Sequence, residues 1–237
     1  MSDRLYLVDP NQLSPMAQVN TTVGSNLYDT IKRDIIFGEL KPSVKLKLGE
    51  TRLRYQASVA TLRETLNRLA SEGFVQAEEQ RGFFVAPVSP DDLTEIANLR
   101  ILLECHALRE SIANGDAEWE ANCVAAYSKL QLMENRLLGG DEDIREIWKR
   151  FDWEFHQALI QACSSRNLLA LHSRIYEKYL RYQMQLLTFR GKPAAREHKR
   201  LLDYALSRDS ESAESVLTAH VLGGLKHAMT VFRDQSK

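Results

Sequence analysis

Six long segments with the apolar spacing of amphipathic helices follow one another after Pro90, and only short breaks separate them. The breaks are rich in Gly, Asn, Ser and Pro, the residue types that end helices and form turns. Because a short loop forces two consecutive helices to pack antiparallel, this pattern predicts a bundle of six helices. The predicted helices cover about residues 91–114, 117–138, 142–163, 166–189, 194–207 and 210–234.

A different pattern precedes this bundle, between residues 26 and 88. It predicts a helix that ends near Gly38, a short helix over 49–56, and a longer helix that starts after Ser58 and ends at Gly73. Residues 74–88 then show two short strands around a turn at 79–82. Three helices followed by a β-hairpin form the layout of a winged helix-turn-helix domain.

The predicted fold class is therefore mainly α, with two domains. An N-terminal winged helix-turn-helix domain, residues 26–88, precedes a C-terminal antiparallel all-helical domain, residues 91–234. Two prolines, Pro87 and Pro90, mark the boundary between them. Residues 1–25 are polar and lack a sustained period, so they are predicted to form a flexible tail.

Composition indicates a cytoplasmic protein. No apolar run approaches the roughly 20 residues that span a bilayer, and the N-terminus is too polar for a signal peptide. The three cysteines are widely spaced and form no CxxC pair, which is typical of a reducing compartment. Residues 26–88 carry 10 Lys/Arg against 8 Asp/Glu, and residues 89–237 carry 20 against 22. This asymmetry is too small to indicate nucleic-acid binding by itself.

The helix-turn-helix layout nevertheless predicts where DNA would be contacted. In such motifs the second helix enters the major groove and its first residues meet base edges. The hydroxyls of Ser58 and Thr61 can bond phosphate or bases, and Arg63 can reach phosphate or a guanine edge. The predicted DNA-binding residues are Arg52, Arg54, Ser58, Val59, Thr61, Arg63, and Arg81 and Gly82 at the hairpin tip. The alternative is a small structural domain with an ordinary charged helix.

Polar side chains interrupt the apolar faces of three helices in the C-terminal domain. In "FDWEFHQALIQA", residues 151–162, Asp152 and His156 fall within the apolar arc of Phe151, Phe155 and Leu159. His198 and His220 lie in the apolar arcs of two later helices. Burying an unpaired imidazole or carboxylate costs several kcal/mol of stability, so these four groups are expected to share one binding partner.

One aspartate and three histidines suit a first-row divalent cation, and imidazole favours zinc, nickel, copper or iron. Asp152 and His156, at positions i and i+4, project from one helix face as two ligands must. The alternative for any single histidine is a hydrogen-bonded core residue. His106 and His172 have no comparable neighbours and are interpreted as structural or surface residues.

The N-terminal segments "LYDTIKRDIIFGELKPSVKLKL", "SVATLRETLNRLASEGFV" and "RGFFVAPVS" closely resemble the DNA-binding domain of GntR-family bacterial regulators. The resemblance covers about residues 26–90. Val59 and Ala60 stand where the family often has Arg and a small or hydroxyl residue, so the operator is expected to differ from the common one. Val59 can pack on a thymine methyl but cannot hydrogen-bond to a base.

The segments "LRILLECHALRE" and "DWEFHQALIQACSSRNL" are similar to the FadR-type helical effector domain of that family, the FCD domain. Its metal-binding subset carries Asp-x3-His on one helix and one histidine on each of two later helices. The resemblance implies that Asp152, His156, His198 and His220 bind a divalent transition metal, with zinc or nickel favoured.

The same resemblance implies a small organic acid effector beside the metal. Arg100 matches a family arginine that points into the effector cavity, although Glu104 at i+4 also predicts a helix salt bridge. Asn167 matches a position near the site but can equally cap the helix from residue 166. His227, beyond His220, either lines the cavity or packs in the core.

These features together predict a ligand-responsive transcription factor rather than an enzyme. We expect a repressor that binds a near-palindromic double-stranded operator as a homodimer and has no membrane partner. One alternative is a metal-dependent hydrolase fused to a DNA-binding head, but no HExxH motif or second carboxylate appears in these arcs. The other is a purely structural metal, for which a closed, protein-only coordination shell would be typical.

Overall fold

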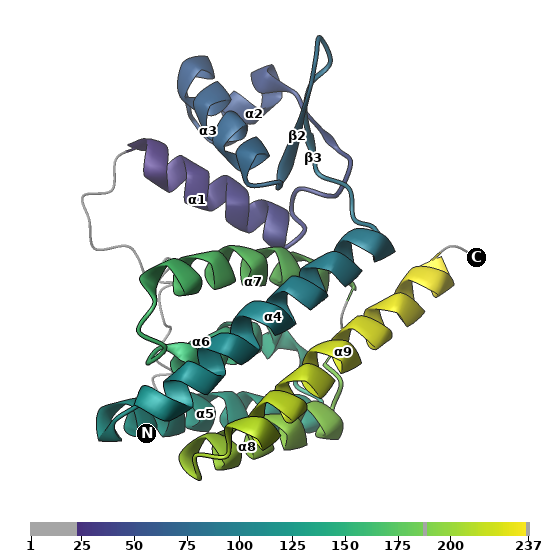
Figure 1. The fold of residues 1–237 in the computed structure, drawn as a ribbon. Coiled ribbons are helices and arrows are strands. Elements are labelled where there is room, and N and C mark those ends of the chain that lie inside the picture. Colours follow the sequence, from purple (N-terminus) through teal and green to yellow (C-terminus); the bar gives the residue numbers. More distant parts are fainter. Residues whose placement is uncertain (1–22, 187–188, 236–237) are drawn as a thin grey trace, which may run out of the picture. The chain divides into compact units, whose positions relative to one another are not determined.

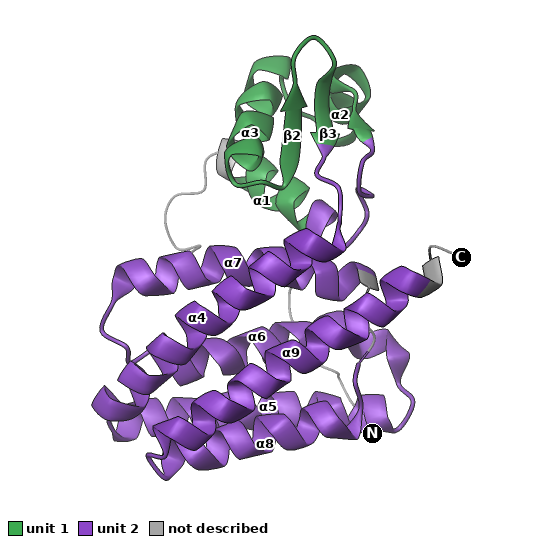
Figure 2. Ribbon diagram, turned by 45° about the vertical axis from the view of Figure 1, so that its right-hand side comes forward, with its two compact units in different colours: residues 1–33, 45–84 green, residues 34–44, 85–237 purple. Residues whose placement is uncertain are grey.

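The computed structural model describes residues 23–186 and 189–235. Most of the predicted tail, residues 1–25, lies outside the described residues, and its last three residues begin the first helix, α1 (Val23–Ile36). The chain divides into two compact units, residues 1–33 with 45–84 and residues 34–44 with 85–237, which Figure 2 colours separately. The domain limits of 26–88 and 91–234 stay a prediction.

The N-terminal elements form the predicted winged helix-turn-helix. After α1 come α2 (Leu48–Arg54), α3 (Val59–Ser71) and the strands β2 (Val75–Glu78) and β3 (Gly82–Val85). Leu62, Leu66 and Leu69 repeat at helical spacing along α3 and are completely buried. The Ser58 hydroxyl caps α3 by accepting a hydrogen bond from the Thr61 amide, 3.1 Å away.

One strand is absent from the sequence prediction. β1 (Lys45–Leu46) pairs antiparallel with β3, with Leu46 opposite Phe83, so the sheet has the order β1-β3-β2. The sequence around it contains a proline and predicts only a connector. Two residues are too few to show the alternation of a strand, and β1 is defined by its partner in the sheet.

The described part of the second unit confirms the prediction of six consecutive helices. They are α4 (Pro90–Asn114), α5 (Ala117–Leu138), α6 (Arg145–Ile160), α7 (Arg166–Leu186), α8 (Lys192–Leu206) and α9 (Ser210–Gln235). The helix α4 lies against α7 and α9, while α5 lies against α6 and α8 (Figure 1). The helix predicted over 142–163 is divided, because a 3₁₀ turn at Glu142–Ile144 precedes α6.

The interior of this helical unit combines an apolar core with an unusual amount of buried charge. Phe155 and Leu159 of α6 are at most 1% exposed, as the helical spacing predicts. Buried charges are stable only when they are paired or bind a metal, so the partners of these groups define the candidate site. Among the described residues, the Arg, Asp, Glu and His side chains with exposed fractions of 1% or less are Arg100, Glu104, Glu134, Asp152, His156, His172 and His198.

The cysteines Cys105, Cys123 and Cys163 are buried and form no disulfide. No helix among the described residues is both long enough and apolar enough to cross a membrane.

Candidate metal centre

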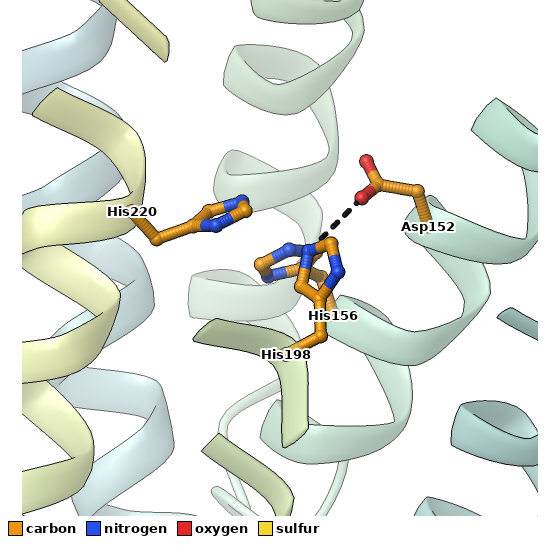
Figure 3. Close-up of side chains that lie close together, drawn as sticks. All are labelled: Asp152, His156, His198 and His220. Carbon is orange, nitrogen blue, oxygen red and sulfur yellow. Dashed lines mark ion pairs between the residues drawn. The ribbon is translucent and has the colours of Figure 1, made fainter. Parts of the chain in front are cut away.

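Three helices bring one aspartate and three histidines together in the interior of the second unit. α6 carries Asp152 and His156 one turn apart, α8 carries His198 and α9 carries His220. One potential ligand atom from each of the four residues lies within 4.8 Å of the others. Figure 3 shows the three rings and the carboxylate converging, with a dashed line for the ion pair of Asp152 and His198. The structure therefore brings together the four residues selected by their helical arcs.

Each histidine is oriented by a carboxylate at its Nδ1 atom. His156 Nδ1 lies 2.5 Å from a Glu104 oxygen, and His198 Nδ1 lies 2.6 Å from a Glu134 oxygen. His220 Nδ1 lies 2.9 Å from a Glu197 oxygen. Because an ionised carboxylate only accepts hydrogen bonds, Nδ1 carries the proton in each pair. Histidines held in this way present Nε2 as the metal-binding atom.

The opposite ring nitrogens support this orientation. His156 Nε2 and His198 Nε2 are buried without a hydrogen-bond partner. His198 Nε2 does lie 3.3 Å from an Asp152 oxygen, but this ion pair lacks the geometry of a hydrogen bond. Buried imidazole nitrogens left open beside a carboxylate fit a divalent cation of the zinc type, which binds histidine nitrogen and carboxylate oxygen.

Asp152 is held as an ionised carboxylate. Its Oδ2 atom accepts a hydrogen bond from the Tyr176 hydroxyl at 3.0 Å and one from Lys149 Nζ at 3.3 Å. Burial acts to raise the pKa of Asp152, but Lys149 and the nearby histidines outweigh burial and hold this pKa well below its ordinary value. Asp152 is therefore a ready anionic ligand at neutral pH.

The three histidines differ in charge. Burial lowers the pKa of His156 and holds the pKa of His220 well below its ordinary value, so both rings are neutral at pH 7. Burial acts to lower the pKa of His198 as well, but Asp152 and Glu134 outweigh it and raise this pKa to about 9. Without a metal, His198 therefore carries a second proton at pH 7, and this proton lies on the nitrogen that a metal would bind.

Metal binding is therefore expected to release about one proton per ion at pH 7. Below pH 9 the apparent affinity should fall by about tenfold per pH unit, because the proton on His198 competes with the metal. When His198 is protonated, its interactions with Asp152 and Glu134 stabilise the metal-free fold. This contribution to the free energy of unfolding is fully present below pH 6.5 and is lost as pH rises through the folded-state pKa of about 9. The metal-induced rise in Tm should consequently grow between pH 6.5 and 9. Calorimetric titrations in buffers of different ionisation enthalpy count the protons, and zero release would contradict this assignment.

A small cavity, partly open to solvent and with room for about one water molecule, lies beside the cluster. Asp152, His198 and His220 line one side of it, and the cationic side chains of Lys149 and Arg190 line another. Arg190 is held by Glu197, with a nitrogen–oxygen distance of 2.6 Å. The cavity thus reaches three of the four residues, and both cations on its wall are paired with carboxylates, Lys149 with Asp152 and Arg190 with Glu197.

A glycine pair on α9 permits this wall to form. A Cβ atom at Gly224 would lie 2.4 Å from the hydroxyl oxygen of Tyr179, and one at Gly223 would lie 2.6 Å from a nitrogen of Arg190. Both distances are shorter than van der Waals contact. The two glycines therefore give Tyr179 and Arg190 the room to approach α9.

Arg100 takes the role of a buried salt bridge. Its Nε atom donates to Glu104 at 2.8 Å, and its guanidinium lies over the rings of Tyr176 and Tyr179, 4.5 and 4.7 Å from their centroids. Arg100 is completely buried and is not among the described residues that line the cavity. Of the two roles predicted for it, the structure shows the helix salt bridge, and an effector contact stays a prediction.

The other predicted effector contacts also lie away from the cavity wall. Asn167 is exposed in the first turn of α7, and His227 is half-buried on α9, two turns beyond His220. Neither is among the described residues that line the cavity, so these contacts also stay predictions. His172, interpreted from sequence as structural or surface, is buried, and its Nε2 atom lies 2.9 Å from Glu104.

Sequence reasoning missed the three orienting carboxylates and the two cavity cations. From sequence, Glu104 is predicted only as a partner of Arg100, and neither Glu134 nor Glu197 is predicted to orient a histidine. One signal was present for Glu134, which lies between the buried Leu130, Met133 and Leu137 at helical spacing. The same test of polar residues in apolar arcs that selected Asp152 would therefore have found it.

The predicted DNA contacts lie together around α2, α3 and the β2–β3 turn. The Ser58 and Thr61 hydroxyls are 2.9 Å apart and bond to one another, and Arg81 forms an ion pair with Glu78. Arg63 projects from the first turns of α3 into solvent. DNA contact by these residues stays a prediction. The exposed members of the predicted set are Arg52, Arg54, Ser58, Val59, Arg63, Arg81 and Gly82, and Thr61 is half-buried.

Comparison with known proteins identifies the class. Residues 24–85 match the model of the bacterial regulatory proteins of the gntR family, and residues 95–223 match the FCD domain. The chain therefore belongs to the GntR family of transcriptional regulators, with an FCD domain, as its sequence predicts. This membership confirms the expectation that the protein is not an enzyme, and the hydrolase alternative is set aside.

Individual relatives agree with this family. The HTH-type transcriptional regulator BphR of Paraburkholderia xenovorans (strain LB400) is 37% identical over 87% of this chain and 85% of its own length. The HTH-type transcriptional repressor GlaR of Escherichia coli (strain K12) is 29% identical over 82% of this chain and 90% of its own. The structure of E. coli McbR/YncC has the same fold, with a TM-score of 0.72 and 18% identity over 92% of this chain and 100% of that one.

Proposed function

We propose that this regulator is a metal-dependent sensor of a small organic acid. The FCD domain binds a divalent transition metal, zinc or nickel, through Asp152, His156, His198 and His220, and the acid binds beside it. The observation that carries this proposal is the set of four buried donors within 4.8 Å, in which each histidine is held at Nδ1 by a carboxylate.

The cavity supports an acidic effector rather than a closed structural metal site. Four protein ligands leave one or two open positions on a metal that accepts five or six donor atoms. Three of the four ligands, Asp152, His198 and His220, line the cavity. A carboxylate oxygen of the effector would complete the coordination sphere. Lys149 and Arg190 lie on the cavity wall, where their N–H groups can donate to a carboxylate.

Helix α7 offers a physical route from the site to the N-terminal end of α4. At one end, Tyr176 donates a hydrogen bond to Asp152. Two turns further on, the Tyr182 hydroxyl lies 2.6 Å from an Asp92 oxygen and accepts a hydrogen bond from the Ser89 amide. A shift of α7 on effector binding would therefore be transmitted to residues 89–92, which follow the DNA-reading elements in the chain.

At the DNA, we propose that a homodimer in the cytoplasm places two α3 helices on the half-sites of a near-palindromic operator, about one helical turn apart. Effector binding then shifts the dimer away from its DNA-binding state. The name of the relative GlaR describes a repressor, which supports repression as the mode of action.

The DNA contact is tested by replacing Arg63 with alanine. A duplex selected by the protein from a random pool should bind this variant about 1–3 kcal/mol more weakly, because Arg63 contacts phosphate or a base edge. Arg145→Ala removes the same charge from an exposed position of the helical unit and should leave DNA affinity unchanged. Equal affinity of the Arg63 variant and wild type, measured by fluorescence anisotropy, would place the contact elsewhere.

The sensing function is tested with the same duplex. Protein stripped with a chelator is reloaded with zinc or nickel and titrated in the presence of a panel of small mono- and dicarboxylates. We expect at least one acid to weaken DNA binding by about 5- to 150-fold in the loaded protein and to have little effect on the stripped protein. DNA binding that ignores every acid, with and without metal, would refute the proposal.

A further inference from the structure

Helix α7 supplies none of the four proposed metal ligands, but two of its side chains connect to the two ligands of α6. His172 and Tyr176 lie one turn apart on α7 and are completely buried, and their ring centroids are 5.7 Å apart. Because buried polar groups need hydrogen-bond partners, the partners of these two side chains show which groups they support.

Tyr176 acts directly on Asp152. The Tyr176 hydroxyl donates to Oδ2 of Asp152 at 3.0 Å, and Lys149 Nζ donates to the same oxygen at 3.3 Å. The other carboxylate oxygen, Oδ1, lies 3.3 Å from His198 Nε2. Two donors on Oδ2 therefore fix the rotation of the Asp152 carboxylate, so that Oδ1 stays directed at the nitrogen of the next proposed ligand.

His172 acts on His156 through Glu104 of α4. His172 Nε2 lies 2.9 Å from Oε2 of Glu104, and Arg100 Nε donates to the same oxygen at 2.8 Å. The other oxygen, Oε1, lies 2.5 Å from His156 Nδ1. Glu104 is thus held through one oxygen and holds His156 through the other, which leaves His156 Nε2 as the metal-binding atom.

Gln157 of α6 determines which nitrogen of His172 carries the proton. The amide nitrogen Nε2 of Gln157 lies 2.9 Å from His172 Nδ1. Because an amide nitrogen only donates, Nδ1 is the acceptor, and the proton of the neutral ring lies on Nε2, which donates it to Glu104. A chain of hydrogen bonds therefore starts at Gln157, passes through α7 and α4, and ends at the adjacent residue, His156.

We propose that His172 and Tyr176 are positioning residues of the metal centre, with His172 orienting His156 through Glu104 and Tyr176 orienting Asp152. This inference rests on the proposed function, because both side chains act through residues assigned to the metal. Groups that orient a metal ligand typically change metal affinity by about 10- to 100-fold when they are removed. Helix α7 thus contributes to metal affinity without supplying a ligand.

The test measures the zinc affinity of the full-length protein by competition with a chelator. His172→Phe and Tyr176→Phe keep all four ligands but allow one of them to turn, so each should raise the dissociation constant for zinc by about 10-fold. His172→Gln keeps an N–H donor at the end of the side chain and should restore most of the affinity that His172→Phe loses. This recovery separates a hydrogen bond from the packing of a ring.

A second measurement reports the geometry of the site. The visible absorption spectrum of the protein loaded with cobalt(II) depends on the arrangement of the ligands, so His172→Phe and Tyr176→Phe should shift its bands, and His172→Gln should return them toward wild type. Gln157→Leu removes the first hydrogen bond of the chain without changing His172, and it should lower zinc affinity in the same direction. Circular dichroism of each metal-free variant verifies that the fold is retained.

Two control variants remove the same kinds of side chain elsewhere in the helical unit. Tyr127→Phe removes the hydroxyl of a buried tyrosine of α5, whose described partner is Gln131 at 3.0 Å. His106→Phe replaces an exposed histidine of α4. Neither side chain is hydrogen-bonded to a proposed ligand or to Glu104 among the described residues, so both controls should keep the zinc affinity and the cobalt spectrum of wild type.

The outcomes separate this proposal from the proposed function. Dissociation constants for zinc within about threefold of wild type in both His172→Phe and Tyr176→Phe, well below the change expected for orienting groups, would overturn the positioning role and leave the metal centre intact. Equal losses in the two controls, or no recovery in His172→Gln, would also overturn it. Failure of the wild-type protein to bind zinc would overturn the metal centre and the positioning role together.

Discussion

Replacing both His198 and His220 with alanine is expected to abolish stable metal binding. The variant loses two of the four ligands, one from α8 and one from α9, and Asp152 and His156 on a single helix are left to hold the ion. The apparent dissociation constant should rise by about 10³-fold or more, because each ligand contributes several kcal/mol in four-ligand sites. Elemental analysis and native mass spectrometry of protein purified without a chelating tag measure bound metal, retained acid and dimer mass together.

Two further variants sharpen this experiment. Glu134→Gln keeps all four ligands but weakens the group that orients His198, so it should lower metal affinity by about 10- to 100-fold. His106→Ala removes an exposed histidine of α4 and should leave the metal content unchanged. Full metal content in the His198/His220 double variant would show that these residues are not the ligands.

Replacing Arg100 with methionine is expected to destabilise the helical unit by about 3–5 kcal/mol. Glu104 is 1% exposed and depends on Arg100, His156 and His172 for compensation. Burial acts to raise the pKa of Glu104, but Arg100 and His156 outweigh it and hold this pKa well below its ordinary value. Without Arg100, a buried carboxylate loses its strongest charge partner. Urea denaturation of the metal-free protein measures the change in the free energy of unfolding.

The same helix provides a matched control. Arg109 also pairs with a glutamate, Glu214, through two nitrogen–oxygen contacts of 2.6 and 2.5 Å, but its side chain is 56% exposed. Because solvent screens exposed pairs, Arg109→Met should cost at most about 1 kcal/mol. Similar losses for the two variants would contradict the assignment of Arg100 to a buried structural pair. A normal unfolding free energy with lost acid response would instead support the predicted effector contact.

The contrast between Arg100 and Arg109 shows where sequence reasoning reaches its limit. Both arginines have a glutamate within reach, and Glu104 at i+4 predicts the Arg100 pair. The sequence does not show that Tyr176 and Tyr179 cover one guanidinium while the other meets water. That difference depends on how α7 packs against α4, and it determines whether the pair contributes little or much to stability.

The hairpin shows a similar limit. β2 and β3 are predicted because they are adjacent in sequence and flank a turn, whereas β1 is a strand only through its pairing with β3. Local patterns predict elements whose stabilising contacts are local, and they miss elements that depend on distant partners.

By itself, the sequence determined the order of the helices, the winged helix-turn-helix layout and the four residues of the candidate metal centre. Helical periodicity made this possible, because positions i and i+4 share a face and a buried face must contact another. Only the tertiary structure decided which carboxylate orients each histidine. Glu104, Glu134 and Glu197 lie 52, 64 and 23 residues from their histidines, and these pairs form only once the helices have packed.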